Sequence, residues 1–375
     1  MGEVLGPLNV LNKALPTGVD GTRLAEWAMR DGVTYEQLVN IVALALGDIN
    51  QQLVSDWGWL FYLTEELFQE YEQGGSVTPM PELTDTDRPE ARHGETIGHM
   101  IDLHAYGDAV GGTRRYFRDI RSAQVQAAIS GVVRRGVWRF EQELLGRWFS
   151  NSETAIGSAG YNVPFVRGTG GNVDYAPPAW QGEAFATSHD HFLGVDSDSA
   201  SWSDGLESMA ETLQEHGHEP PYTCIVSRAD IATFGALTNF VEIIDVNGLI
   251  SIDRGGETSG NRFFQRGTRN KGYFGDYQTA YGLVQMRSSA RVPTAYAGMV
   301  KSYGSLDVRN PLAIRIHPME GFGMFVVPET VPNDDVPIKQ LDVEFEFGVG
   351  VGMDRTNGTA AFLDSSGTWT NPTIS

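Results

Sequence analysis

Residues 342–363 constrain the fold of this chain more than any other stretch, because they join a long strand pattern to a turn signal. Apolar residues recur there with a period of two, which places them on one face of an extended strand. They are Val343, Phe345, Phe347, Val349 and Val351. Residues 354–358 tolerate a tight reversal, and residues 359–363 can then run back alongside. We therefore predict a β-hairpin, which is a packing element without a catalytic motif.

The charge of the chain argues against one class of function. Its 375 residues include 48 acidic and 27 basic ones, which gives a net charge of -21. Such a surface repels nucleic acid over most of its area, so a protein that reads DNA sequence is disfavoured. Any contact with DNA would have to be local. The length is sufficient for two or three domains with a buried core.

Cysteine usage and apolar runs bear on the compartment. The single cysteine, Cys224, lies in an apolar run, which predicts a buried thiol and excludes an intramolecular disulfide. The longest apolar run, residues 41–46, is far shorter than the ~20 residues that cross a bilayer. No basic cluster precedes an apolar core near the first residue, and Gly6 breaks the myristoylation pattern. We expect a soluble protein made in a cytoplasm, with no membrane partner.

An amphipathic helix is predicted close to the N-terminus. Thr34 and Gln37 have the spacing of a capping box, and the apolar period continues to about Trp57. The apolar positions are Leu38, Ile41, Val42, Ala45, Leu46, Ile49 and Leu53.

Residues 76–95 cannot bury a core of their own, because Pro79, Pro81 and Pro89 stand among acidic and polar residues. A long structureless stretch inside a compact domain usually has a function, such as reaching another molecule. We predict an extended arm anchored on a strand over residues 97–103, and a plain surface loop is the alternative. The candidate intersubunit residues of this arm are Glu82, Asp85, Asp87, Arg88, Glu90 and Arg92.

Residues 113–149 form the longest helical candidate, about 55 Å if unbroken at 1.5 Å per residue. Steps of 100° per residue predict one broad apolar face. It comprises Tyr116, Ile120, Ala123, Ala127, Val137, Trp138, Leu144, Leu145 and Trp148. The opposing sector is basic. It comprises Arg114, Arg118, Arg121, Arg135, Arg139 and Arg147.

The arm and the helix have opposite charge. Residues 65–102 hold ten acidic residues against two arginines, whereas residues 113–148 hold eight arginines against three acidic residues. The acidic arm of one subunit could dock on the basic helix of another, and such pairing guides encounter and register. The basic face could instead contact packaged DNA through phosphates, or it could be a solvated surface.

The middle of the chain alternates helix and strand. We predict a helix over residues 203–217 capped by Ser203, with Leu206, Met209 and Leu213 inward and Gly217 as its end. A buried strand over 222–226 and a short helix capped by Ser227 follow. Further strands are predicted at 312–316 and 322–327, before the closing hairpin.

Four segments together resemble one protein family. They are YGDAVGGTRRYFRDI (106–120), SHDHFLGV (188–195), RNPLAIRIHP (309–318) and residues 342–363. In order and spacing they resemble the major capsid proteins of tailed bacteriophages, which have the Hong Kong 97-type fold. The resemblance implies an α+β fold with an N-terminal arm and helix (1–58), an E-loop (59–105), a peripheral domain with a spine helix (106–183), an α/β axial domain (184–303) and a C-terminal sheet that returns to the peripheral domain (304–375).

The resemblance also implies a function. It predicts a structural protein that self-assembles as hexamers and pentamers into an icosahedral head enclosing double-stranded DNA, in the host cytoplasm and then in the virion. Scaffold, portal and decoration proteins are the expected partners, and no cofactor is expected. Some family members crosslink subunits through a lysine on the E-loop. The lysines here are Lys13, Lys271, Lys301 and Lys339, none of them on the arm, which disfavours that reaction.

Two alternatives remain at this stage. An encapsulin-like shell has the same architecture but encloses a protein cargo. A metal-dependent hydrolase could use His189 and His191, which would face the same side of a strand, with His216 and His218 as further donors. No HExxH motif, nucleophile elbow or phosphate loop accompanies them, so we predict no catalytic residue and no metal.

Overall fold

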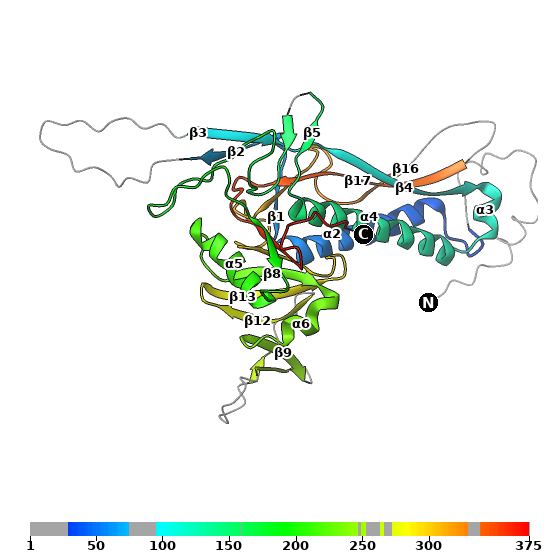
Figure 1. Cartoon of the computed structure of the whole chain (residues 1–375). Helices are drawn as coiled ribbons and strands as arrows, with labels where there is room; N and C mark the ends of the chain where they lie inside the picture. The colour runs from blue at the N-terminus through cyan, green and yellow to red at the C-terminus, as the bar shows by residue number, and fades with distance from the viewer. Residues whose placement is uncertain are drawn as a thin grey trace, which may run out of the picture. The chain divides into compact units, whose positions relative to one another are not determined.

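The computed structural model describes residues 29–74, 95–158, 160–246, 249–252, 263–265, 272–328 and 338–374. The chain divides into two compact units. The first draws on Met1–Ile49, Tyr106–Gly136 and Gly323–Phe345, and the second on Asn50–Ala105, Val137–Phe322 and Glu346–Ser375. Both contain helices and strands, so the predicted α+β class is confirmed (Figure 1). The five-part domain division stays a prediction.

Helix α2 (Tyr35–Trp57) begins at the predicted capping box. The main-chain N–H of Thr34 donates to Oε1 of Gln37 at 3.0 Å, and the N–H of Gln37 donates to Oγ1 of Thr34 at 3.2 Å. These bonds satisfy donors that a helix start leaves unpaired. One side of the helix is buried, in part as the apolar period predicts. The buried residues are Tyr35, Leu38, Val42, Leu46, Leu53 and Trp57, whereas Ile41 and Ala45 of the predicted face are exposed.

Residues Gln37–Trp57 of α2 are also long and apolar enough to cross a membrane, judged by length and composition alone. The longest uninterrupted apolar run, residues 41–46, did not predict a helix long enough to cross a membrane, because the apolar residues are spread over the whole helix. Only 22% of the most apolar window is buried, and Leu44 is 76% exposed. We interpret α2 as an amphipathic helix, because its buried residues recur at helical spacing on one side.

The predicted single helix over 113–149 is wrong, since two helices stand there. They are α3 (Arg114–Asp119) and α4 (Ser122–Phe149), and Ile120 between them is extended with φ -92° and ψ 154°. The carboxylate of Asp31 accepts hydrogen bonds from the N–H of Ser122 at 2.9 Å and from its hydroxyl at 2.5 Å. A new helix start therefore forms at Ser122, with its own partner for the unpaired donors.

The apolar face predicted for this region is wrong in part. Tyr116 and Trp138 are 42% and 41% exposed, although both were placed inward. Leu144, Leu145 and Trp148, at the end of α4, are buried as predicted. α4 also buries residues that the 100° steps place off that face, so its middle is covered on a second side. They include Val125, Ile129, Val132, Val133 and Phe140.

Strands of the first unit pair along the first half of β17 (Ile338–Val351). β16 (Phe325–Pro328) runs antiparallel to it with Phe325 opposite Glu344, and β4 (His104–Thr113) pairs with β17 as well. The predicted strand over 322–327 thus exists but starts three residues later.

A nine-stranded mixed sheet dominates the second unit, in the order β11-β10-β9-β12-β13-β8-β14-β18-β7. The strand bounds are β7 (Phe192–Asp196), β8 (Tyr222–Ser227), β9 (Phe240–Val246), β10 (Leu249–Ile252), β11 (Phe263–Gln265), β12 (Tyr273–Thr279), β13 (Gly282–Ser289), β14 (Tyr296–Val300) and β18 (Thr359–Asp364). β8 is parallel to β13 and antiparallel to β14, and β18 is parallel to β7. The C-terminal segment therefore supplies one strand of this sheet.

Helix α5 (Trp202–Glu215) packs on that sheet with Leu206, Met209 and Leu213 buried, as predicted. Its cap is Ser201, two residues before the predicted Ser203, because the Asp204 carboxylate accepts from the N–H of Ser201 at 2.7 Å. β8 is buried throughout and includes the free Cys224, where burial raises the pKa of the thiol. The turn η1 (Arg228–Asp230) and helix α6 (Ile231–Gly235) follow it, after the predicted cap at Ser227.

Smaller strand groups complete the second unit. β1 (Phe61–Thr64) runs parallel to β15 (Leu312–Arg315), which pairs antiparallel with the second half of β17. β2 (Phe68–Gln73) and β3 (Glu95–Met100) form a separate ribbon (Figure 1). β5 (Thr154–Ile156) and β6 (Gly160–Asn162) form a short hairpin.

The predicted hairpin at 342–363 is wrong. Its alternating face is present, since Val343, Phe345 and Phe347 are buried, but β17 and β18 belong to different sheets. The connection between them is a buried loop, not a tight reversal. The side-chain amide of Asn357 donates to the carbonyls of Lys301 at 2.9 Å and Arg309 at 3.2 Å, so polar bonds to distant segments hold this loop.

Candidate functional site

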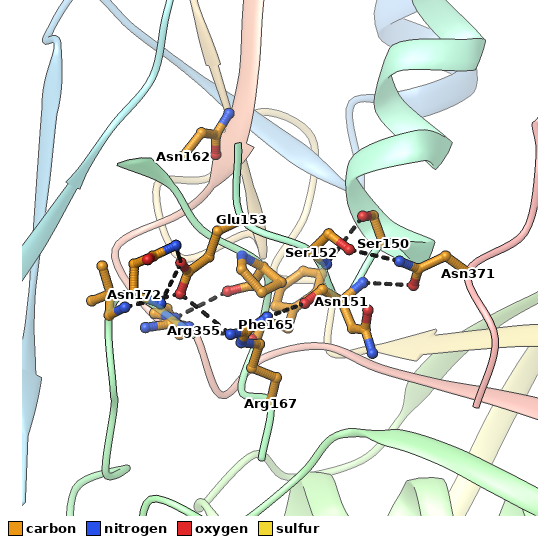
Figure 2. Close-up of polar contacts among 12 residues, drawn as sticks. Ser150, Asn151, Ser152, Glu153, Asn162, Phe165, Arg167, Asn172, Arg355 and Asn371 are labelled. Carbon is orange, nitrogen blue, oxygen red and sulfur yellow. Dashed lines mark hydrogen bonds and ion pairs between the residues drawn. The ribbon is translucent and has the colours of Figure 1, made fainter. Parts of the chain in front are cut away.

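The loop between β17 and β18 carries a buried arginine, Arg355, which is 1% exposed. Its guanidinium donates to the carbonyl of Phe165 at 3.4 Å (Figure 2). It also donates to the carbonyl of Pro164 at 3.0 Å and to the hydroxyl of Tyr71 at 3.2 Å. It also lies over the Tyr175 ring, 4.5 Å from the ring centre. Hydrogen bonds and a cation–π contact therefore replace the water that this charge loses on burial.

Arg147, near the end of α4, is buried too, which differs from its predicted place on an exposed basic face. It donates to the carbonyls of Ser150 at 3.1 Å and Ser152 at 2.7 Å. These carbonyls follow the end of the helix, where cations are favoured. Burial, and then the charge of Arg355, lower the pKa of Arg147 to about 10. Arg147 is therefore a structural cation inside this chain and is not available to a partner.

An acidic residue, Glu153, organises the other side of this region. Its carboxylate accepts from the main-chain N–H of Asn172 at 2.7 Å and of Val173 at 3.0 Å, and it lies 3.6 Å from the guanidinium of Arg167 (Figure 2). Burial acts to raise its pKa, but these hydrogen bonds outweigh it and the pKa is lowered. Arg167 in turn donates to the Asn151 carbonyl at 3.0 Å.

The C-terminal segment is attached to the same region. The side-chain carbonyl of Asn371 accepts from the N–H of Asn151 at 3.0 Å, and its amide donates to the hydroxyl of Ser152 at 2.8 Å (Figure 2). The network of Arg355, Arg147, Glu153 and Asn371 thus ties together segments far apart in sequence. Its groups are occupied by the protein itself, which is the arrangement of a structural junction.

His99 on β3 lies beside this network and is 2% exposed. Among the described residues neither ring nitrogen has a hydrogen-bond partner of good geometry, and the Tyr71 ring is 5.6 Å away. Burial first, and then the charges of Arg355 and Arg147, lower the pKa of His99 to about 3, although the main chain of Val351 is close enough to favour the protonated ring and acts to raise it. It is therefore neutral at physiological pH.

The remaining predicted basic residues lie on α3, α4 and the turn between them. Arg118, Arg121, Arg135 and Arg139 are exposed, and nothing is described for the side chain of Arg114. Intrachain acids pair with several of them. Arg118 bonds Asp119 at 2.8 Å, Arg139 bonds Glu143 at 2.7 Å, and Arg135 pairs with Asp108. The positive charge offered to a partner is therefore smaller than the count of arginines predicts.

The predicted arm residues Glu82, Asp85, Asp87, Arg88, Glu90 and Arg92 lie outside the described residues. The ribbon that leads to them is described. One face of β2 and β3 is buried through Tyr71 and His99, while Glu70 and Glu72 are exposed and Phe68 is 56% exposed. The base of the predicted arm thus has an open face that is acidic and partly apolar.

The structure assembles a histidine cluster that sequence spacing did not reveal. His189 and His191, just before β7, meet His216 at the end of α5. The Nε2 atom of His216 lies 2.9 Å from that of His189 and 3.0 Å from that of His191. His218 lies elsewhere, with Nε2 at 3.0 Å from the hydroxyl of Thr356. Of the two further donors that the sequence offered, His216 therefore joins the pair and His218 does not. The sequence could not choose between them, because His216 is 25 positions from His191 and reaches it only through tertiary packing.

Comparisons with solved structures place the fold. A chain of Mycobacterium phage Patience aligns with a TM-score of 0.63 at 19% identity, over 96% of this chain and 97% of that chain. A chain from the capsid of the Cyanophage P-SCSP1u aligns with a TM-score of 0.47 at 9% identity, over 81% and 86%. A chain from the capsid of a native GTA particle gives 0.46 at 12% identity, over 83% and 90%. No protein-family model and no curated protein matches the chain.

The alignment with the Mycobacterium phage chain confirms the resemblance to phage structures that the sequence suggested. At 19% identity it establishes a shared fold, and it runs nearly the full length of both chains. The mixed helix-and-sheet fold is therefore shared with that Mycobacterium phage chain.

Proposed function

We propose that this chain is a major capsid protein with a Hong Kong 97-type fold, which self-associates as hexamers and pentamers into an icosahedral head around double-stranded DNA. The observation that carries the proposal is the alignment over 96% of this chain and 97% of the phage chain. The four sequence segments resemble the same class independently. Assembly would take place in the host cytoplasm, with scaffold, portal and decoration proteins as partners.

The described elements correspond to the parts that such a protein needs. The nine-stranded sheet with α5 is assigned as the axial domain, α4 as the spine helix, and the β2–β3 ribbon as the base of the E-loop. The internal junction at Arg355 and Arg147 holds this framework without help from a neighbour. A shell protein requires a stiff subunit, since many weak contacts are summed only if each keeps its geometry.

The exposed surfaces that a neighbouring subunit could contact differ in charge and polarity. The exposed face of β2 presents Glu70 and Glu72, and the exposed side of α2 presents Leu44. On α3 and the following turn, Arg118 and Arg121 are exposed. We assign the acidic ribbon and its arm to a basic neighbour surface, because opposite charges guide encounter and register.

A charge-reversal variant separates docking from DNA binding. The triple variant Arg118→Glu, Arg121→Glu and Arg139→Glu should block assembly if the arm docks on this surface. If the surface contacts packaged DNA, the same variant should form shells that hold less DNA. Arg228→Glu is the control, since it reverses an exposed arginine outside α3 and α4 and should assemble like the wild type.

Electron microscopy of the expressed protein tests the proposal directly. Closed shells, alone or with a scaffold protein, are expected. A strictly monomeric protein at high concentration under both conditions would contradict it. Shells that form in the cell and contain protein cargo without nucleic acid would favour the encapsulin-like alternative.

A further inference from the structure

We propose that His189, His191 and His216 bind one transition-metal ion of the zinc class, as a structural clamp between α5 and the β7–β18 edge of the nine-stranded sheet. The close contacts among the three imidazoles are made by the Nε2 atom of each ring. Their Nε2 atoms are separated by 2.9 Å and 3.0 Å along the two close approaches, and all three offer ligand atoms within 4.8 Å of one another. This inference does not depend on the capsid role.

The hydrogen atoms of the three neutral rings cannot satisfy both close contacts between their Nε2 atoms, and a cation bound among these atoms would remove that conflict. Nδ1 of His191 lies 2.8 Å from the carbonyl of Gly358, and only a protonated nitrogen can donate to that oxygen. The neutral ring therefore points a bare Nε2 at His216. Nε2 of His216 carries at most one hydrogen but is close to two nitrogens, so one of the two approaches lacks an ordinary two-centre hydrogen bond.

The surroundings orient two of the three rings. The Gly358 carbonyl holds the ring of His191, in the manner of an acceptor behind a metal-binding histidine. The ring of Phe185 packs on His216 with centroids 4.2 Å apart.

The donor set and spacing select the kind of metal. Three imidazole nitrogens suit Zn²⁺, Co²⁺, Ni²⁺ or Cu²⁺, whereas Mg²⁺ and Ca²⁺ prefer oxygen ligands. Zn–N bonds of 2.0–2.1 Å in a tetrahedral site place nitrogens about 3.3 Å apart. The two close Nε2 pairs, at 2.9 Å and 3.0 Å, need to separate by only a few tenths of an ångström, and the ligand atoms of His189 and His191 lie within 4.8 Å of each other. His189 and His216 are partly exposed, which leaves a side for a fourth ligand.

The location of the cluster assigns the ion a structural role. The carbonyl of His191 accepts from the N–H of Ala360 at 2.9 Å and from the hydroxyl of Thr359 at 2.8 Å, so His191 is the point where β18 attaches to the β7 segment. His216 caps the C-terminus of α5. An ion bound here would fix the helix end to two strands contributed by distant parts of the chain.

A cobalt titration tests the site. The full-length protein is treated with chelator, dialysed and titrated with Co²⁺, whose visible absorption reports tetrahedral coordination, and zinc content is measured by mass spectrometry after incubation with Zn²⁺. The wild type is expected to bind one ion per chain. Zn²⁺ should also raise its unfolding temperature, because a ligand that binds only the folded state stabilises it.

Variants locate the binding. His189→Gln and His216→Gln remove ligands that are only partly buried, so folding should be retained, and each should lose the stoichiometric ion and the thermal shift. His104→Gln is the matched control, because His104 is an exposed histidine outside the cluster. The proposal is overturned if the wild type binds no ion in the titration, or if either ligand variant binds with wild-type affinity.

Discussion

The buried His99 makes the stability of this protein sensitive to acid. Its pKa in the folded chain is about 3, against 6.5 for an ordinary histidine. Between these values the unfolded chain binds a proton that the folded chain does not, so stability is lost as the pH falls below 6.5. Arg355 and Arg147 both oppose its protonation, whereas the main chain of Val351 favours it, and the Tyr71 ring packs beside it.

The expected loss of unfolding free energy follows from the pH interval over which only the unfolded chain binds this proton. At pH 4.5 the unfolded His99 is about two pH units below its pKa, while the folded side chain is still neutral. Each unit is worth about 1.4 kcal/mol, so acidification from pH 7.5 should cost about 3 kcal/mol through this residue alone. For a chain of this length that corresponds to a fall in the unfolding temperature of roughly 3 °C.

The variant His99→Met isolates this contribution. The ring makes no hydrogen bond of good geometry to the described residues, and methionine is of similar size and adapts to irregular space, so stability at pH 7.5 should change by less than about 1 kcal/mol. The free energy of unfolding, measured by chemical denaturation from pH 7.5 to 4.5, should fall about 3 kcal/mol less in the variant than in the wild type. His104→Met, at an exposed histidine, should follow the wild-type profile. Parallel profiles for wild type and His99→Met would refute the reasoning.

Two further substitutions test the packing of the second unit. Arg355→Leu should lower the free energy of unfolding by about 3 kcal/mol in denaturant titrations, because it leaves buried acceptors unpaired, and wild-type stability would contradict the assigned junction. Gly348→Ala should prevent accumulation of soluble protein, since the added Cβ would collide with the carbonyl of Asp102. Gly146→Ala is its control on α4, where a Cβ meets nothing within 4 Å, and it should stabilise the protein by up to about 1 kcal/mol.

Local signals predicted local structure well. The start of α2 at Thr34 and Gln37 was predictable because both partners of the capping box lie within one turn. The burial of Leu206, Met209 and Leu213 on α5 follows from helical spacing alone. The α3–α4 break was not predictable in this way, because the partner of Ser122 is Asp31, more than 90 residues earlier.

In the candidate sites, too, local sequence predicted some features and tertiary contacts decided the others. Arginines spaced along a helix predict a basic face, and four of them are exposed, but Arg147 is buried because carbonyls beyond the helix end receive it. The pair His189 and His191 was visible in the sequence as two donors on one side of a strand. His216 joins them only where α5 ends against that strand.

The sequence by itself determined the start of α2, the buried side of α5, the alternating face of β17 and the family of folds that the chain resembles, because these properties depend on period, caps and composition. Only the tertiary structure decided that β17 and β18 enter different sheets, that Arg355 is the centre of a buried junction, and that three histidines meet. A period of two specifies a strand and its buried face but not its neighbour, since strand partners are chosen by packing among segments that the chain brings together from afar.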